Sequence, residues 1–301
     1  MPNRILLLTA IPDQVPPLAD AIQHREPSVH CLSGFDAHDD SALAGVDVVL
    51  GWRFPKGLAA RLSGLRWVCS MAAGVEKLLV PDLAQGIPVS RVVDPEQATG
   101  MGQYAAAMIL RHARGLARYE GQQRDRDWTR YPMAVARHQV VVLGWGEVGR
   151  EVGRQLQALG FTVRGWRRDG TPLPAALRDA QIVVNTLPLT RETEGLLDAL
   201  AFAAMPRGAY LVNIARGGHV VEADLIAAVC SGHLAGAALD VQQHEPLPPD
   251  DPLWTVPGIT ITPHIASQPL TDVVADQFVA GLRCLRRGAP LPNLIDRARG
   301  Y

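Results

Sequence analysis

The chain has 301 residues, of which 48% are hydrophobic and 20% are charged. This composition supports one large α/β unit or two ordinary domains, and it excludes disordered and collagen-like chains. The formal net charge of -1 excludes the basic field that a nucleic-acid-binding protein needs, and no apolar run is long enough to span a membrane.

Cysteine usage and the start of the chain indicate the compartment. Cys31, Cys69, Cys230 and Cys284 are scattered without a metal-binding spacing, so we expect reduced thiols and no metal site. Only residues 1–4 precede the first apolar run, and no small-residue cleavage site follows it, so we expect no secretory signal peptide. The chain is therefore predicted to be cytoplasmic, with neither a nucleic-acid nor a membrane partner.

Short apolar runs that favour strands alternate with helical patterns along the whole chain, which predicts a parallel α/β architecture. The strands expected in the first third are residues 5–8, 29–32, 47–50 and 67–70, with helices at 15–23 and 56–62. A second series of strands is expected at residues 139–143, 162–166, 182–185, 209–214, 237–241 and 259–262. Each series predicts a complete doubly wound unit.

Two long helices connect these series. One, of residues 97–118, lies between them, and the other, of residues 270–287, follows the second. A helix after a finished sheet usually returns to pack elsewhere, so we expect the second domain to be inserted into the first. The charged stretch 124–127 is interpreted as a solvated loop.

The strand at 139–143 runs directly into Gly144, Gly146 and Gly149, in the pattern G-x-G-x-x-G, and an apolar helical face follows. In dinucleotide-binding folds the first glycine permits a tight turn, the second lets the backbone approach a pyrophosphate, and the third lets helix and strand pack closely. The N-terminus of the helix would then bind the phosphates. The alternative is a glycine turn without a ligand in a structural βαβ unit.

The end of the next strand discriminates between the nicotinamide cofactors. An acidic residue there binds the ribose of NAD, whereas arginine suits the 2′-phosphate of NADP. This strand is expected to end at Trp166, and Arg167 and Arg168 follow it, with Asp169 as the competing acid. Because two guanidinium groups suit a phosphate, we favour NADPH, with NADH as the alternative. The remaining alternative is that the two arginines only solvate a loop.

Each of the last three predicted strands runs into a polar residue: Arg216, Glu245 and His264. Ligands of open parallel sheets bind at the carboxyl ends of strands, so these side chains are expected beside the nucleotide site. Each of them alone would usually be structural. A cation, an acid and an imidazole together predict a catalytic site.

Together these motifs resemble those of the D-isomer-specific 2-hydroxyacid dehydrogenase family. The segments that carry the resemblance are 144–149, 185–193, 213–217, 240–246 and 262–266. In the N-terminal half, residues 51–53, 71–75 and 99–104 are similar to the glyoxylate/hydroxypyruvate reductase A branch, apart from Gln103, where many relatives carry an acid. The resemblance implies a flavodoxin-like substrate domain, residues 1–97 and 269–301, into which a Rossmann nucleotide-binding domain, residues 98–268, is inserted.

The roles that the resemblance implies agree with what the side chains can do. His264 would donate a proton to the carbonyl oxygen of a 2-oxo acid, because imidazole titrates near neutral pH. Glu245 would fix its tautomer and favour the imidazolium, and Arg216 would bind the substrate carboxylate or polarise the carbonyl. The implied cofactor-binding residues are Gly144, Trp145, Gly146, Glu147, Val148, Gly149, Trp166, Arg167, Arg168, Leu187, Pro188, Thr193, Ile214, Ala215, Arg216, Asp240, His264 and Ala266.

Further substrate-binding residues are expected in the first domain. Besides Arg216 and His264, they are Trp52, Ala73 and Gly74. Residues 72–75 follow the strand at 67–70 and are expected to begin a helix, whose N–H groups would form an anion nest. The alternatives are a structural turn at 72–75 and a Trp52 that is simply packed.

The leading hypothesis is an NADPH-dependent reductase that converts glyoxylate and hydroxypyruvate into glycolate and D-glycerate. The alternatives are a dehydrogenase for another D-2-hydroxy acid, such as phosphoglycerate, and a nucleotide-sensing protein like the family's transcriptional corepressors. The resemblance further implies a homodimer built on the helix 97–118. Several histidines without a predicted role are interpreted as surface or core residues: His112, His138, His219, His233 and His244.

Overall fold

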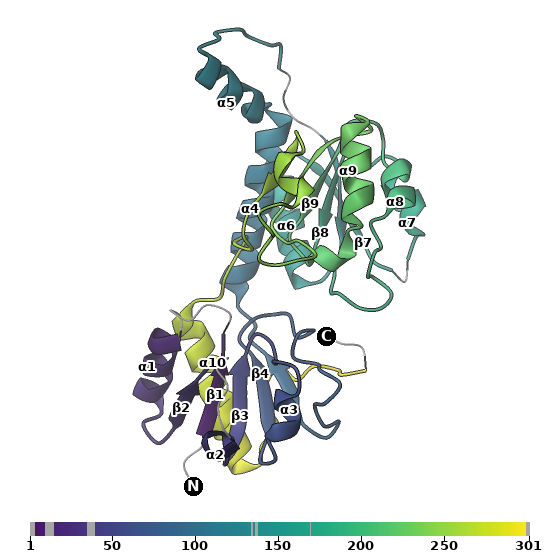
Figure 1. Cartoon of the computed structure of the whole chain (residues 1–301). Coiled ribbons are helices and arrows are strands. Elements are labelled where there is room, and N and C mark those ends of the chain that lie inside the picture. Colours follow the sequence, from purple (N-terminus) through teal and green to yellow (C-terminus); the bar gives the residue numbers. More distant parts are fainter. Residues whose placement is uncertain are drawn as a thin grey trace. The chain divides into compact units, whose positions relative to one another are not determined.

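The computed structural model describes residues 4–9, 15–34, 40–133, 135, 138–168 and 170–298 (Figure 1). The chain divides into two compact units. The first unit comprises Met1–Pro95 and Gln268–Tyr301, and the second comprises Glu96–Ser267. The sequence predicts domain borders at 97/98 and 268/269, whereas the compact units divide at 95/96 and 267/268. The separate roles of the two units stay predictions.

The first unit is built on a five-stranded parallel sheet in the order β2-β1-β3-β4-β5. Its strands are β1 (Arg4–Leu8), β2 (His30–Ser33), β3 (Val46–Gly51), β4 (Trp67–Ser70) and β5 (Val89–Arg91). Its helices are α1 (Val15–Arg25), α2 (Asp40–Leu43), α3 (Leu58–Arg61) and α10 (Thr271–Arg287). The strand order reverses beside β1, as in flavodoxin-like sheets, so this unit has the predicted class.

Successive side chains of a strand point to opposite faces of the sheet, and both faces of this sheet are apolar. Ile5 and Leu7 of β1 pack in one core with α1 and α10. Leu6 and Leu8 pack in a second core on the other face, with α2 and α3. Figure 1 shows α1 and α10 on one side of this sheet. The near-continuous apolar runs seen in the sequence are therefore strands buried on both faces.

The second unit is built on a six-stranded parallel sheet in the order β11-β10-β9-β8-β6-β7. Its strands are β6 (Gln139–Leu143), β7 (Thr162–Trp166), β8 (Ile182–Asn185), β9 (Ala209–Asn213), β10 (Leu234–Leu239) and β11 (Ile259–Ile261). Its helices are α4 (Pro95–Ala113), α5 (Leu116–Asp125), α6 (Glu147–Ala158), α7 (Leu173–Leu177), α8 (Ala199–Ala204) and α9 (Glu222–Cys230). The predicted class of two parallel-sheet α/β units is confirmed.

Helices cover both faces of this sheet as well. Apolar residues of α7, α8 and α9 pack with Val141 and Leu143 on one face. Residues of α4 and α6 pack with Val140 and Val142 on the other. The chain runs from β6 to β7 on one side and later to β8 on the other, so the strand order reverses beside β6. A reversal of this kind opens a crevice at the carboxyl ends of the strands, where ligands of such folds bind.

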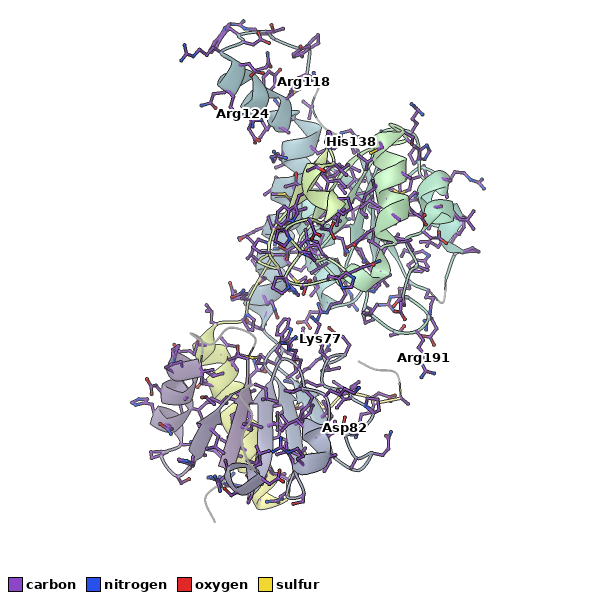
Figure 2. The ribbon with its side chains drawn as sticks, in the orientation of Figure 1. Lys77, Asp82, Arg118, Arg124, His138 and Arg191 are labelled. Carbon is purple, nitrogen blue, oxygen red and sulfur yellow. The ribbon has the colours of Figure 1, made fainter. Side chains whose placement is uncertain are left out.

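The helix predicted at 97–118 is wrong at its C-terminal end. α4 ends at Ala113 and a new helix, α5, begins at Leu116, because Gly115 adopts a left-handed conformation with φ 61°. The predicted loop at 124–127 is also wrong in part, since Arg124 and Asp125 form the last turn of α5. Figure 2 shows Arg118 and Arg124 on this helix. The three-residue β5 was not predicted, because it is too short to produce a recognisable pattern.

Candidate active site

The glycine loop joins β6 to α6 with the geometry that the motif predicts. Gly144 has φ 92°, in the left-handed region that favours glycine, and α6 starts at Glu147 directly after Gly146. A Cβ on Gly149 would overlap the carbonyl oxygen of Gly144, so this glycine permits the close contact between helix and turn. A Cβ on Gly146 would meet no described protein atom within 4 Å. The loop is therefore tightly packed at Gly144 and Gly149 and open at Gly146.

The side chains between these glycines lie differently from one another. The ring of Trp145 lies against Gly153 of α6 and Gly165 of β7, where a Cβ would overlap or closely approach it. Glu147 is exposed in the first turn of α6, where an acid suits the helix dipole, and Val148 is half-buried. The ring of Trp145 thus packs between α6 and β7 and anchors the loop there.

The end of β7 presents two cations near this loop. Trp166 is buried as the last residue of the strand, as predicted, and its Nε1 donates to the carbonyl of Thr171 at 2.7 Å. Arg167 is exposed and donates to the carbonyl of Trp145 at 3.0 Å. Arg168 forms an exposed ion pair with Glu192 at 3.1 Å. The competing acid, Asp169, lies outside the described residues.

Bonds to the hydroxyl of Thr190 and to Arg168 hold the pKa of Glu192 below its usual range, with the hydroxyl as the larger cause. Glu192 is therefore ionised at neutral pH, and it orients a guanidinium that stays open to solvent. An exposed pair of this kind is weak, so a phosphate can replace the carboxylate as the partner of Arg168.

Two buried amides shape the turns after β8 and β9. Asn185 donates to Asn213 at 3.0 Å, and each accepts an N–H two residues further on, from Leu187 and Ala215 respectively. Asn213 also donates to the carbonyl of Arg216 at 3.0 Å. These amide side chains therefore fix both turns at the carboxyl edge of the sheet, which includes the predicted residues Leu187, Ile214 and Ala215.

His219, which has no predicted role, joins the same two turns. It is fully buried, and its ring nitrogens lie 3.0 Å from the carbonyl of Arg216 and 3.2 Å from that of Pro188. Thr193 donates to the same Pro188 carbonyl at 2.7 Å. The only feature of the sequence that could have indicated this role is the position of His219, three residues after Arg216 and directly after two glycines. It is a core residue of the site, not a surface histidine.

The predicted catalytic residues follow three neighbouring strands. Arg216 follows β9, Glu245 follows β10 and His264 follows β11. His264 Nδ1 lies 3.2 Å from Glu245 Oε2, with side chains 26% and 23% exposed. Gly217, next to Arg216, approaches the backbone of Gln242 so closely that a Cβ would overlap it, which brings the loop after β9 against the loop after β10. The carboxylate can therefore orient the imidazole ring.

Asp240 directly follows β10, and its carboxylate accepts hydrogen bonds from the loop that carries His264. One oxygen accepts from the N–H of Ile265 and the other from that of Ala266, both at 2.8 Å. The side chain is 1% exposed. The sequence assigned Asp240 to cofactor binding, and in the structure it also organises the turn after β11.

The substrate-binding residues predicted in the first unit lie at the carboxyl ends of β3 and β4. Trp52 is half-buried after β3, and its N–H donates to Leu8. Residues 72–75 do not begin a helix, so this expectation is wrong. Instead the Ser70 hydroxyl accepts from the N–H of Ala72 and donates to the carbonyl of Gly74 at 2.6 Å, which closes a turn around Ala73. The anion nest that a helix N-terminus would supply is therefore not formed in this way.

Among the described residues, no group of three or more His, Cys, Asp or Glu side chains is arranged to hold a metal ion. No helix in the described part of the chain combines the length and apolar character that crossing a membrane requires.

Comparison with known proteins gives a consistent result. Residues 106–266 match the family model for the NAD binding domain of D-isomer specific 2-hydroxyacid dehydrogenases. The chain is 36% identical over 276 residues to glyoxylate/hydroxypyruvate reductase A of Yersinia enterocolitica, covering 85% of this chain and 88% of the relative.

Two solved structures are similar over nearly the whole chain. A D-isomer specific 2-hydroxyacid dehydrogenase from Xanthobacter autotrophicus, in complex with NADPH and MES, has a TM-score of 0.88 at 36% identity and full coverage of both chains. An NADPH-dependent glyoxylate/hydroxypyruvate reductase from Sinorhizobium meliloti, in complex with NADP and sulfate, has a TM-score of 0.90 at 29% identity, covering 99% of this chain and 100% of the other. With the family model and these relatives in agreement, the chain belongs to the D-isomer-specific 2-hydroxyacid dehydrogenase family.

Proposed function

We propose that this protein is an NADPH-dependent reductase of small 2-oxo acids, which converts glyoxylate and hydroxypyruvate into glycolate and D-glycerate. The observation that carries the proposal is the His264–Glu245 pair at the same sheet edge as the glycine loop. The relatives described above, which are named for this activity, support the choice of substrates.

The reaction adds a hydride to C2 of the substrate and a proton to its carbonyl oxygen. A bound NADPH supplies the hydride. Protonated His264 donates the proton to the oxygen, while Glu245 holds the other ring nitrogen and stabilises the positive charge before transfer. Arg216 binds the substrate carboxylate through its guanidinium and draws electron density from the adjacent carbonyl. In the reverse direction neutral His264 accepts the hydroxyl proton.

The residues of the second unit fit a dinucleotide. The open face of Gly146 and the start of α6 suit the pyrophosphate, since the first N–H groups of a helix bind anions. Arg167 and Arg168 suit the 2′-phosphate that distinguishes NADPH from NADH. The other cofactor-binding residues of the sequence analysis, and Trp52, Ala73 and Gly74 for the substrate, stay predictions that belong to this proposal.

The two cations after β7 give the first test of this assignment. Replacing Arg167 and Arg168 together by alanine should weaken NADPH binding by about 10- to 100-fold, since a charge-assisted hydrogen bond contributes roughly 1.5–3 kcal/mol. NADH affinity should change little. Fluorescence titration of both nucleotides measures the ratio. Arg164→Ala is the matched control, because Arg164 lies on β7 itself, shortly before these two residues, and pairs with Asp179. Equal losses for both nucleotides would contradict the assignment.

The glycine loop gives a second test, with opposite expectations for two neighbouring glycines. Gly149→Ala should lower the free energy of unfolding by about 1–3 kcal/mol, because the new methyl group overlaps the backbone of Gly144. Gly146→Ala should leave stability almost unchanged and should weaken NADPH binding, because its methyl group meets only the space reserved for the pyrophosphate. Urea unfolding and nucleotide titration separate the two effects. A Gly146→Ala variant that binds NADPH normally would argue against a phosphate cradle.

A homodimer is part of the proposal, and the region around α5 supports it. Figure 1 shows α5 beyond the end of α4, away from the six-stranded sheet. Arg111 of α4 binds Glu120 of α5 with two bonds, and Arg118 lies over the ring of Tyr131 at 4.4 Å. The large apolar side chains exposed here are Leu116, Trp128, Tyr131, Met133 and Val135. Exposed apolar side chains of this kind are typical of a protein–protein interface.

The dimer is tested at Trp128, which is 87% exposed. We expect a dimer mass for the unmodified protein in light scattering and a shift toward the monomer for Trp128→Ser, since aromatic anchors carry much of the binding energy of an interface. Trp254→Ser is the matched control, because Trp254 is an exposed tryptophan elsewhere in the same unit. A monomeric mass for the unmodified protein would refute the dimer.

The cytoplasmic location stays a prediction, supported by four free cysteines.

Initial rates test the whole proposal. The purified protein is assayed with glyoxylate, hydroxypyruvate, pyruvate and longer 2-oxo acids, each with NADPH and NADH. We expect the highest kcat/KM for glyoxylate or hydroxypyruvate with NADPH. Faster turnover of a phosphorylated 2-oxo acid would favour a phosphoglycerate-like dehydrogenase, and nucleotide binding without turnover of any 2-oxo acid would favour a nucleotide-sensing role.

A further inference from the structure

A chain of hydrogen bonds connects helix α4 to the loop that carries His264. The hydroxyl of Tyr104, on α4, lies 2.6 Å from Thr262 Oγ1, although the two residues are 158 positions apart. Thr262 Oγ1 in turn donates to Asp240 Oδ1 at 2.6 Å. An ionised carboxylate only accepts, so Thr262 uses its single proton on Asp240. Tyr104 must therefore be the donor to Thr262, and the chain runs in one direction.

This chain ends on the residues that determine where the imidazole lies. Thr262 is two residues before His264, and the Asp240 carboxylate accepts the N–H groups of Ile265 and Ala266 directly after it. The N–H of His264 itself donates to the carbonyl of Asp240 at 2.9 Å. His264 has φ 57°, a left-handed conformation that is uncommon for residues other than glycine. A conformation of this kind persists only where surrounding bonds hold it.

We propose that Tyr104 is a positioning residue of the reductase: its hydroxyl orients Thr262 and the Asp240 carboxylate, which together hold His264 in its left-handed turn beside Glu245. The inference rests on the proposed function, because positioning matters only where His264 transfers the proton. The hydroxyl of Tyr104 bonds to Thr262 and acts on His264 through the loop, so its effect on turnover is indirect.

Tyr104 is suited to this task at every working pH. Burial raises the pKa of its hydroxyl to about 12, and the bond to Thr262 opposes this shift only in part. The hydroxyl therefore stays protonated and remains a donor well above neutral pH. The direction of the chain consequently does not change over the pH range in which an imidazole titrates.

The structure supplies a matched control in Tyr210, on β9. Its side chain is buried, its hydroxyl bonds to Thr260 of β11, and burial raises its pKa to about 12, as for Tyr104. Thr260 lies two residues before Thr262, which directly follows β11, and Thr260 accepts a hydrogen bond from Arg111. Tyr104→Phe and Tyr210→Phe therefore each remove a tyrosine hydroxyl that bonds to a threonine, but only the first interrupts the chain to Asp240.

We expect Tyr104→Phe to lower kcat about three- to tenfold, which corresponds to the loss of one ordinary hydrogen bond in the transition state. KM for the 2-oxo acid and the Kd for NADPH should stay unchanged, and Tyr210→Phe should keep the kcat of the unmodified enzyme while losing similar thermal stability. Thr262→Val, which removes the hydroxyl, should lower kcat. Thr262→Ser, which retains the hydroxyl, should keep a kcat close to that of the unmodified enzyme. Equal kcat for the two tyrosine variants would overturn the inference.

Hydrogen exchange gives a readout that needs neither cofactor nor turnover. In the nucleotide-free protein the amides of Ile265 and Ala266 should exchange faster in Tyr104→Phe than in Tyr210→Phe or the unmodified chain. Unchanged exchange would overturn the positioning role even if the enzyme is active. An unmodified protein that reduces no 2-oxo acid would instead refute the proposed function, so the two failures are distinguishable.

Discussion

His264→Ala should lower kcat for glyoxylate or hydroxypyruvate by about 10²- to 10⁴-fold, the usual contribution of a positioned general acid. The proton would then have to come from water, which is neither positioned at the carbonyl oxygen nor oriented by a hydrogen bond to Glu245. NADPH affinity should remain close to that of the unmodified enzyme, because the glycine loop and the β7 cations are untouched. Stopped-flow measurement of NADPH oxidation and nucleotide titration together give both quantities.

His244→Gln is the control for this variant. His244 adjoins Glu245 in sequence, but its side chain is exposed and has no role in the proposed mechanism. It should therefore retain normal turnover. A His264→Ala enzyme with undiminished kcat would remove the basis of the proposed mechanism, and an equal loss in His244→Gln would mean that the loss reflects disturbance of the loop around Glu245.

Arg216→Ala should lower kcat/KM by about 10- to 100-fold, because a hydrogen bond to a charged group contributes roughly 1.5–3 kcal/mol. The loss should appear in both KM and kcat, since the guanidinium binds the carboxylate in the ground state and polarises the carbonyl as negative charge develops on its oxygen. Arg216→Lys should restore only part of the activity, because an ammonium group cannot form the planar, two-pronged contact.

Steady-state rates with a 2-oxo acid and with its uncharged amide separate these two contributions of Arg216. The unmodified enzyme should prefer the acid strongly, and Arg216→Ala should lose most of that preference. A preference that survives the substitution would assign carboxylate binding to another residue. Arg207→Ala serves as the control, because Arg207 lies before β9, at the opposite end of that strand from Arg216.

The elements that follow from strong local patterns could be predicted from the sequence. The apolar runs that become β6 and β8 were placed at the right residues, because strands buried on both faces are continuously apolar. The glycine motif was equally informative, since at Gly144 and Gly149 the structure leaves no room for a side chain.

Other features depend on contacts that no local pattern records. Helical periodicity continues past Gly115, so the break between α4 and α5 was missed, although a single left-handed glycine is enough to produce it. The turn at residues 72–75 is closed by the side chain of Ser70, which a search for helix starts does not consider. His219 and Tyr104 acquire their roles only through partners that the fold brings together from distant parts of the chain.

The contrast at the end of β7 has a consequence for how this enzyme can change over evolution. Trp166 is buried and anchored, whereas the two residues after it project into solvent. If Arg167 and Arg168 bind the 2′-phosphate, as proposed, substitutions at 167 and 168 would change the enzyme's preference between NADPH and NADH without repacking the interior. Selection could then change the cofactor preference of the enzyme through surface substitutions alone, with little effect on its folding stability.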